Sequence, residues 1–433
     1  MIQTKETSAQ RATEEYLRRI EERDEKLGAF IYVDPERALE QARGVDALAA
    51  SGNVLGPLHG KVVAVKDLVT IDGMPTYAGS EIPIDDLVPP EGPFVRALRA
   101  AGCVIVGKTR STEFALGTFN LDRRTPWNPC DLEVHRMPGG SSNGSAVAVG
   151  AGLCDFAIGS DTGGSVRMPA AMCGIAGYRP SPGVWSTSGV FPLSPLLDTL
   201  GPLTATAADA ANVFEALSGN RLAPVRIERL RFGKPAKVFY DDLDPDVAAC
   251  MEEALSRLEQ AGVRIDPVDV PELDMVDAVF AKMITADLVA TLGRERVLTH
   301  LARLDSVVRD RIRGGLEIAA SDYITMVRRC ATLAAAAAER MRGFDAWITP
   351  TSPCIPIPIS ECGTVEAAAA WNRRSLRNTR PGNVFALCGV SIPIGGLGSA
   401  LGVGLQLLGA CGDDAKLLAI AVAVEHALGT GRS

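Results

Sequence analysis

The chain has 433 residues, of which 47% are hydrophobic and 22% are charged, and its formal net charge is -8. This composition allows a large buried core, and the acidic balance disfavours nucleic acid or an anionic membrane surface as the main partner. The ten cysteines show neither a C-x-x-C spacing nor a cysteine–histidine metal pattern, and no apolar run reaches the length of a membrane span. With no apolar leader after Met1, we expect a cytoplasmic protein with reduced thiols.

The first third of the sequence predicts alternating helices and strands. An apolar stripe up to Leu27 indicates an amphipathic helix, and Asp34 followed by Pro35 is typical of the start of a second helix. The β-branched run 61–67 predicts a buried strand that ends in Lys66. A helix is expected at 94–101, a strand at 103–106 and a short helix at 112–119. Alternating units of this kind indicate an α/β protein.

Two turns rich in glycine and serine follow, at 139–145 and 159–165. Between them lie a run of small residues, predicted to form a short helix, and the short apolar strand 156–158. This order brings the two serine clusters back toward each other in space. Glycine lets the backbone approach a ligand closely, and serine adds hydroxyl groups without bulk. We therefore expect backbone N–H groups gathered around nucleophilic serines, because flexible linkers are not interleaved with buried runs.

The remainder of the chain predicts one further βαβ unit and then mostly helices. The unit comprises a strand at 236–240, a helix that begins at Pro245, and a strand at 263–270. Residues 275–343 are predicted to be mainly helical. Prolines keep 350–358 extended. The chain closes with strand regions near 390–393 and 402–408 and a helix at 413–428.

Residues 102–109 match the phosphate-binding pattern G-x-x-x-x-G-K-[ST]. We interpret them as a strand, because Val104, Ile105 and Val106 are stiff β-branched residues. A loop that cradles phosphate needs open or left-handed conformations at its centre, with its N–H groups turned inward. The pattern also lies across the predicted strand instead of following it, so nucleotide binding is disfavoured.

A second pattern, at 140–144, matches the G-x-S-x-G elbow of α/β-hydrolases with Ser142 as the nucleophile. That chemistry needs a histidine base and an acid further along the chain. Only His300 and His426 follow Ser142, and each lies in a helix-like stretch where a surface or core role is more common than a catalytic one. An esterase that uses Ser142 remains an alternative.

A third interpretation uses lysine as the base and accounts for more residues. Ser165 ends a glycine turn, so its hydroxyl would lie where backbone N–H groups converge and could hold an oxyanion. Burial would lower the pKa of Lys66, because the charged form loses hydration, and a neutral amine accepts protons near pH 7. The hydroxyl of Ser141 could pass the proton between them. The structural alternative for Lys66 is an ion pair with Asp67 or Asp72.

The serine turns and the strand of Lys66 resemble the amidase signature family of Ser-cis-Ser-Lys hydrolases. The similarity rests on residues 64–67, 139–142 and 159–174, and with further segments it covers about residues 8–428. The further segments are 102–109, 125–129, 348–351, 383–393 and 404–425. The resemblance implies a single α/β domain, residues 1–433, in which a mixed central β-sheet is flanked by α-helices. Its parts would be a signature core at about 60–205, a helix-rich variable region at about 215–345, and a C-terminal part at 346–433 that returns to the core.

The resemblance also implies roles for individual residues, and no metal or cofactor. Lys66 would be the base, Ser141 the bridging serine after a cis peptide bond, and Ser165 the nucleophile that becomes acylated. The implied oxyanion hole consists of the backbone N–H groups of Thr162, Gly163, Gly164 and Ser165, and the supporting residues are Ser142, Asp161 and Arg167. Apart from these roles, we select Gly139, Gly140 and Arg377 as candidate substrate contacts, Arg377 because it belongs to the arginine cluster described next.

The expected activity is hydrolysis of a small carboxamide. Arginines gather before residue 383 and on one earlier loop: Arg373, Arg374, Arg377 and Arg380, with Arg123 and Arg124. One of them could pair with a carboxylate of the substrate, although a solvated basic face explains the cluster more simply.

Two other kinds of protein compete with a stand-alone amidase. Within the family, the alternative is the glutaminase subunit of a tRNA-dependent amidotransferase, which the modest length and the lack of a docking extension disfavour. A non-catalytic binding protein is disfavoured because all three catalytic positions are present. A homodimer fits the resemblance, but no interface can be identified from the sequence.

Overall fold

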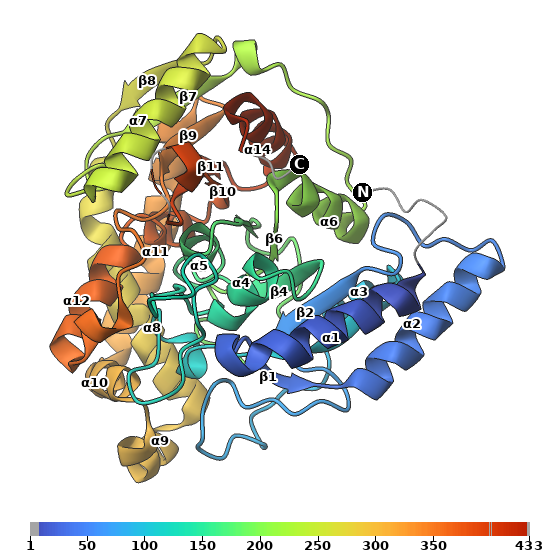
Figure 1. The fold of residues 1–433 in the computed structure, drawn as a ribbon. Coiled ribbons are helices and arrows are strands. Elements are labelled where there is room, and N and C mark those ends of the chain that lie inside the picture. Colours follow the sequence, from blue (N-terminus) through green and yellow to red (C-terminus); the bar gives the residue numbers. More distant parts are fainter. Residues whose placement is uncertain (1–7, 398, 400, 431–433) are drawn as a thin grey trace.

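The computed structural model describes residues 8–397, 399 and 401–430. These residues form one mixed sheet of 11 strands in the order β1-β3-β2-β4-β6-β5-β10-β11-β9-β7-β8 (Figure 1). The strands are β1 Phe30–Val33, β2 Val62–Lys66, β3 Val104–Thr109, β4 Phe156–Ser160, β5 Ala176–Arg179, β6 Leu200–Thr204, β7 Arg231–Pro235, β8 Arg264–Val268, β9 Ala346–Pro350, β10 Cys388–Pro393 and β11 Gly404–Gly409.

The strand directions confirm an α/β fold with a mixed sheet. Strand β2 runs parallel to both β3 and β4, and β7 runs parallel to β8 and β9. From β4 through β6, β5, β10 and β11 to β9, neighbouring strands are antiparallel. The C-terminal strands β10 and β11 therefore lie near the middle of the sheet, between β5 and β9.

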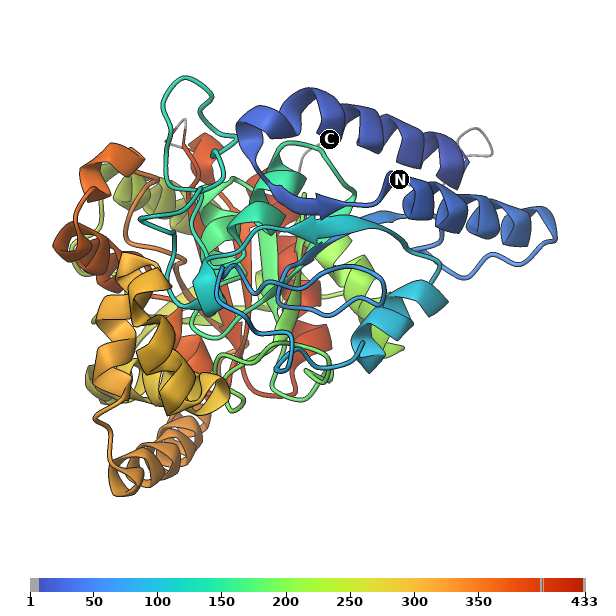
Figure 2. The same cartoon turned by 90° about the horizontal axis from the view of Figure 1, so that it is seen from below.

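Helices surround the sheet, and the first two begin at residues whose side chains cap them. Asp34 caps α2, since its carboxylate accepts the N–H of Arg37 at 3.0 Å, and Ser8 caps α1 in the same way. The α-helices are α1 Ala9–Leu27, α2 Pro35–Ala50, α3 Pro93–Ala100, α4 Asn143–Gly150, α5 Arg167–Met172, α6 Ala207–Ser218, α7 Pro245–Gln260, α8 Val276–Leu292, α9 Arg294–His300, α10 Ser306–Gly315, α11 Ala320–Met341, α12 Val365–Ser375, α13 Arg380–Val384 and α14 Asp414–Leu428. Helices α1 and α2 lie at one end of the molecule and α8 to α12 at the other (Figures 1 and 2).

Alternation along the buried strands divides the apolar residues between the two faces of the sheet. In β2, Val63 and Val65 belong to the larger hydrophobic cluster, whereas Val62 and Ala64 belong to the cluster that includes residues of α1, α2 and α4. Lys66 has the same parity as Val62 and Ala64, so the strand directs it toward the face that α4 covers.

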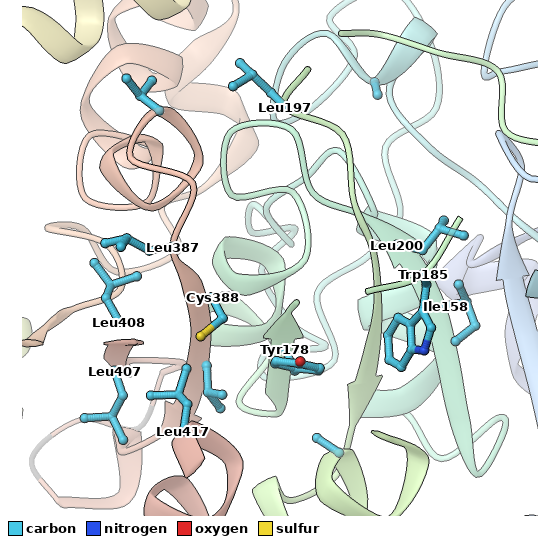
Figure 3. Packing of buried hydrophobic residues seen from close by; sticks show 14 of the residues in the cluster. Ile158, Tyr178, Trp185, Leu197, Leu200, Leu387, Cys388, Leu407, Leu408 and Leu417 are labelled. Carbon is cyan, nitrogen blue, oxygen red and sulfur yellow. The ribbon is translucent and has the colours of Figure 1, made fainter. Parts of the chain in front are cut away.

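The larger cluster packs on the opposite face. Figure 3 shows Ile158, Tyr178, Cys388 and Leu407, from β4, β5, β10 and β11, lying in a row across the sheet. All four side chains are fully buried. The strands that carry the site therefore pack against a dense hydrophobic core, which limits their movement.

Two predicted elements were wrong. The strand expected at 236–240 is a turn with Val238 at φ 69°, and the strand of this βαβ unit is β7, which ends at Pro235. The helix expected at 112–119 is one 3-10 turn at Glu113–Ala115, in which Phe114 and Ala115 have φ of 52° and 58°. The side chain of Glu113 accepts bonds from distant segments here, so tertiary contacts override the local helical preference.

The other predicted elements are present within a few residues of their expected ends. Residues 104–109 of the phosphate-binding pattern form the buried strand β3, as expected. No helix of the described part of the chain is long and apolar enough to cross a membrane. The same residues contain no group of three histidine, cysteine or acidic side chains placed to hold a metal ion.

Candidate active site

Lys66 lies at the end of β2, between β3 and β4, and its side chain is fully buried. Its Nζ donates to Ser141 Oγ at 2.7 Å and to Ser160 Oγ at 2.9 Å. Burial lowers the pKa of Lys66 to about 7, against the opposing fields of Asp198 and Asp161. At neutral pH, a large fraction of this lysine is therefore an uncharged amine that can accept a proton.

The ion pair suggested as a structural role for Lys66 is not formed. Asp67 instead lies 3.5 Å from Lys108 Nζ, and it accepts the N–H groups of Tyr77 and Gly79. Within the described residues, Lys66 has hydroxyl partners only. An amine held by hydroxyls and not by a carboxylate is suited to proton transfer.

Ser141 stands on an unusual backbone, because the Gly140–Ser141 peptide bond is cis. The turn admits no side chain before it: a Cβ on Gly139 would lie 2.6 Å from Met168 Sδ, and one on Gly140 would overlap the carbonyl of Thr118. The Ser141 carbonyl accepts the N–H of Thr112 at 3.2 Å. These contacts direct the Ser141 hydroxyl toward Lys66.

Ser165 ends the second serine turn, between β4 and α5, and is 4% exposed. The two turns are joined directly, because the N–H of Ser142 donates to the carbonyl of Ser165 at 3.2 Å. The Ser142 hydroxyl donates to the Ser160 carbonyl at 3.3 Å. Serines that are far apart in the chain are thus brought together, on either side of α4 and β4.

The turn before Ser165 is packed as tightly as the first. Gly164 has φ 118°, and a Cβ there would overlap the hydroxyl of Thr379. A Cβ on Gly163 would overlap the ring of Phe280, from α8. Thr379 Oγ1 also donates to the Gly163 carbonyl at 2.7 Å, which orients the peptide groups of the turn.

The carboxylate of Asp161 also holds this turn in place. Its carboxylate accepts the N–H of Gly164 at 2.9 Å and forms buried ion pairs with Arg167 at 3.0 Å and Arg179 at 3.4 Å. Burial opposes the charged carboxylate, but the two guanidinium groups outweigh it and hold the pKa of Asp161 well below its usual range. Because the Gly164 N–H is already bound to Asp161, it is not available to a ligand.

Arg167 connects the turn to the C-terminal strands. Its guanidinium is fully buried and donates to Gln406 Oε1 in β11 and to Asn383 Oδ1 in α13, both at 2.7 Å. Asn383 in turn donates to Asp161 at 2.8 Å. Arg167 and Asp161 therefore hold the turn from the side of the protein interior. Their role as supporting residues of the reaction stays a prediction.

The alternative that uses Ser142 finds no base. His300 ends α9 and His426 lies in the last turn of α14, and neither donates to or accepts from the Ser142 hydroxyl within the described residues. The hydroxyl is instead used in the bond to the Ser160 carbonyl. Ser142 itself lies at the N-cap of α4.

Three of the six clustered arginines form ion pairs with acidic side chains among the described residues. Arg374 pairs with Asp244 at 2.6 Å, Arg380 with Asp277 at 2.7 Å and Arg123 with Glu113 at 2.9 Å. Arg377 is half-buried and donates to the backbone carbonyl of Asp241, and Arg124 donates to that of Glu25. A substrate contact by Arg377 stays a prediction.

Sequence reasoning missed four residues that touch the site. Ser160 is the second partner of Lys66, and its position at the end of a strand beside the glycine turn was a usable signal. Asp198, Phe280 and Thr379 come from segments far along the chain, and no local pattern marks them. Tertiary packing alone brings them to the turn.

The sequence is similar to known proteins over almost its whole length. The sequence model of the Amidase family matches residues 11–418. A protein of Comamonas testosteroni named 2-amino-5-chloromuconic acid deaminase is 38% identical over 421 residues, which cover 94% of this chain and 90% of that protein. The A subunit of the glutamyl-tRNA(Gln) amidotransferase of Acidothermus cellulolyticus is 34% identical over 476 residues, with 99% and 92% covered.

Solved structures are similar over almost the whole chain. The native peptide amidase of Stenotrophomonas maltophilia superposes with a TM-score of 0.82 at 26% identity, covering 99% of this chain and 95% of that one. A second structure, described as an amidase, has a TM-score of 0.87 at 31% identity, with 97% and 96% covered. The chain belongs to the amidase family, whose members hydrolyse C–N bonds.

Proposed function

We propose that the protein hydrolyses the C–N bond of a small carboxamide through an acyl-enzyme on Ser165. The observation that carries the proposal is the 2.7 Å hydrogen bond from the Lys66 amine, whose pKa is about 7, to the Ser141 hydroxyl. Ser141 follows the cis bond at a turn that is joined to Ser165 through the neighbouring residue, Ser142. A base, a relay and a nucleophile thus occupy one buried cluster.

The proposed acylation begins with the neutral Lys66 amine. The amine takes the hydroxyl proton of Ser141, which takes that of Ser165, as the Ser165 oxygen attacks the carbonyl carbon. The negative oxygen of the tetrahedral intermediate is held by backbone N–H groups of the turn. Of the four donors that the sequence suggests, Gly164 is bound to Asp161, so the proposed donors are those of Thr162, Gly163 and Ser165.

The leaving group and water complete the cycle through the same residues. The Lys66 ammonium returns its proton through Ser141 to the departing nitrogen, and ammonia or an amine leaves as the C–N bond breaks. Water then attacks the ester and loses a proton along the same relay, which releases the carboxylic acid and Ser165. No step requires a metal or a cofactor.

The experiment is release of ammonia or amine from acidic, neutral aliphatic, aryl and glutamine amides. We expect turnover by the wild type, and a loss of at least about 1,000-fold in Ser165→Ala and Lys66→Ala. Ser145→Ala is the matched control, because Ser145 is a buried serine of α4 that bonds Thr109 and the Ile158 carbonyl. Full activity of Ser165→Ala would disprove the mechanism.

For the substrate, we propose an amide that carries a carboxylate. The Comamonas relative is named for a deamination of an amino acid of the chloromuconic type, which is acidic. In this chain, burial followed by the repulsion of Arg380 lowers the pKa of Arg311 to about 10, against the attraction of Asp310, and none of the ion pairs between described residues includes Arg311. A substrate carboxylate would supply that partner.

Kinetics separate this assignment from the basic-face explanation. Arg311→Gln and Arg377→Gln are compared on an acidic amide and on its methyl ester. We expect KM for the acid to rise about tenfold in the variant of the contacting arginine, with KM for the ester unchanged. Equal effects on both compounds, or on neither, would contradict recognition of a carboxylate.

The second candidate is the glutaminase subunit of an amidotransferase. Relatives named as the A subunit of glutamyl-tRNA(Gln) amidotransferase match almost the whole chain, and one of Moorella thermoacetica is 32% identical over 473 residues. On this alternative, the purified chain alone is inactive on every amide, and glutamine is hydrolysed only when partner subunits from a cell extract are added. Turnover of an amide other than glutamine by the purified chain, without partner subunits, would exclude this alternative.

A further inference from the structure

The carboxylate of Asp198 lies between two segments. One is the turn at 161–165, called the oxyanion turn because it carries the proposed oxyanion donors, and the other is the segment that precedes β6. Thr162 Oγ1 donates to Asp198 Oδ1 at 2.5 Å, and the N–H groups of Leu193 and Ser194 donate to Oδ2 at 3.0 Å each. Antiparallel pairing of β4 with β6 brings the two segments together. Both oxygens are thus oriented, and the bond to the hydroxyl fixes Thr162, which is 2% exposed.

Asp198 also acts on Lys66 through its charge. Burial lowers the pKa of Lys66, and of the two carboxylates that oppose this shift Asp198 is the stronger and Asp161 the weaker. Asp161 is neutralised by its ion pairs with Arg167 and Arg179, whereas Asp198 forms no ion pair within the described residues. Burial raises the pKa of Asp198 to about 6, with Lys66 among the groups that hold it lower. The lysine and the carboxylate therefore influence each other's protonation.

The other charged groups around Lys66 and Asp198 are held in contacts of their own. They are Asp161 with Arg167 and Arg179, Lys108 with Asp67, and Asp287 of α8, which accepts from Ser194 and Tyr323. Arg179 also interacts electrostatically with Asp198, although its ion pair is with Asp161. Removal of the Asp198 charge therefore changes the electrostatic field at Lys66. The neighbouring carboxylates do not replace this charge, because they are bound to other partners.

We propose that Asp198 is a positioning residue of the amidase reaction, which fixes Thr162 at the oxyanion turn and controls the protonation of Lys66 through its unpaired charge. The inference rests on the proposed function, in which Lys66 is the base and the Thr162 N–H holds the oxyanion. When Lys66 becomes an ammonium ion during acylation, the nearby carboxylate stabilises it. The side chain of Asp198 bonds Thr162, Leu193 and Ser194, and neither Ser141 nor Ser165 within the described residues, so its proposed action is through Thr162 and Lys66.

The test measures how fast a sulfonyl fluoride labels Ser165, so that no natural substrate is needed. The Ser165 oxygen attacks sulfur, an S–O bond forms as fluoride leaves, and the hydroxyl proton passes through Ser141 to Lys66. The second-order rate is followed by mass spectrometry of the full chain between about pH 5 and pH 9. The variants are Asp198→Asn, which removes the charge, and Asp198→Glu, which keeps it.

We expect the acidic limb of the rate profile to move down by about one pH unit in Asp198→Asn, because an ammonium without a nearby carboxylate loses its proton more readily. The maximal rate should fall about tenfold, because the amide has one acceptor oxygen where the carboxylate uses two, so it cannot accept both the Thr162 hydroxyl and the N–H groups of Leu193 and Ser194. Asp198→Glu should keep the wild-type limb. Asp155→Asn is the matched control, since Asp155 pairs with Lys61 at 2.9 Å at the other end of β2, and its profile should not move.

A purely structural role of Asp198 predicts a different result. The melting temperature would fall while the acidic limb of Asp198→Asn stayed at the wild-type position, and that outcome would overturn the inference. If Asp198→Asn does not fold, Thr162→Val and Thr162→Ser decide: labelling should slow about tenfold in the first and recover in the second. Equal rates in both would overturn the inference as well. If wild-type Ser165 is not labelled at all, the proposed function itself fails.

Discussion

Lys66 is placed where a lysine lowers the stability of the protein. A buried ammonium loses its hydration, and two serine hydroxyls replace only part of it. Because the folded pKa of about 7 lies below the ordinary value of 10.5, the penalty is fully present below about pH 7 and shrinks as the pH rises toward 10.5. Activity and stability thus oppose each other at this residue.

The substitution Lys66→Met tests this opposition. Methionine fills a similar volume without a charge, so we expect an inactive protein whose free energy of unfolding at pH 6 exceeds that of the wild type by about 1–3 kcal/mol. The gain should become small near pH 10, where the folded wild-type lysine is already neutral. Urea unfolding at both pH values provides the measurement, and a gain that is independent of pH would contradict the buried amine.

At the scale of elements, the turn at 161–165 is held by helices from the other half of the chain. Gly163 and Gly164 both lack room for a Cβ, but for different reasons. At Gly163 the obstacle is the far end of the Phe280 ring, whereas Gly164 also has φ 118°, which side chains rarely adopt. The two positions therefore differ in whether a second change can relieve the first.

We expect both Gly163→Ala and Gly164→Ala to slow the labelling of Ser165 about 100-fold. Adding Phe280→Leu to Gly163→Ala should recover part of the rate, because the shorter side chain frees the space. Adding Thr379→Ala to Gly164→Ala should not, because the strained φ remains. Recovery in the second pair and not in the first would refute this account of the turn.

The elements that the sequence predicted well are those with a strong local pattern. The buried run of β2 and the Asp34-Pro35 start of α2 depend only on neighbouring residues. The strand of the βαβ unit was predicted too late in the chain, at 236–240. Its actual sequence, Arg231 to Pro235, contains glycine, two basic residues and proline, which do not form a typical strand pattern. The helix predicted at 112–119 was wrong because the Glu113 carboxylate accepts hydrogen bonds from distant parts of the chain.

The candidate site divides in the same way. Lys66 and the second serine turn were predictable from their places at the ends of buried strands, and the first serine turn from its glycine and serine content. Asp198, Phe280 and Thr379 were not, because their relation to the turn exists only after the sheet has paired and α8 has packed. The bond from the Gly164 N–H to Asp161 is different, because it joins residues of one turn and an aspartate commonly bonds the backbone of its own turn.

At the scale of the whole molecule, the ten cysteines report on how the chain unfolds. Cys411 is exposed, Cys130 is half-buried and the other eight are buried. The buried ones are distributed over the proposed signature core, the helix-rich region and the C-terminal part: Cys103, Cys154, Cys173, Cys250, Cys330, Cys354, Cys362 and Cys388. Burial raises the pKa of several of these thiols, which further slows their reaction.

We propose that residues 1–433 behave as one domain, and thiol labelling in urea tests it. In the folded protein, a thiol reagent should modify Cys411 quickly and Cys130 more slowly. The eight buried thiols should then become reactive together, at one urea concentration that matches the loss of helical circular dichroism. A lower midpoint for Cys250 and Cys330 than for Cys103 and Cys173 would show that the helix-rich region unfolds separately.

The bond from Arg167 to Gln406 has a consequence for the order in which a ribosome delivers the chain. A ribosome makes β11 long after α5, the helix of Arg167, although β11 lies near the middle of the sheet beside β10. While it is still inside the exit tunnel, the buried guanidinium that supports the oxyanion turn lacks its Gln406 partner. The buried framework of the proposed nucleophile is therefore incomplete until β11 has left the tunnel, and we expect a chain truncated before β11 to be inactive.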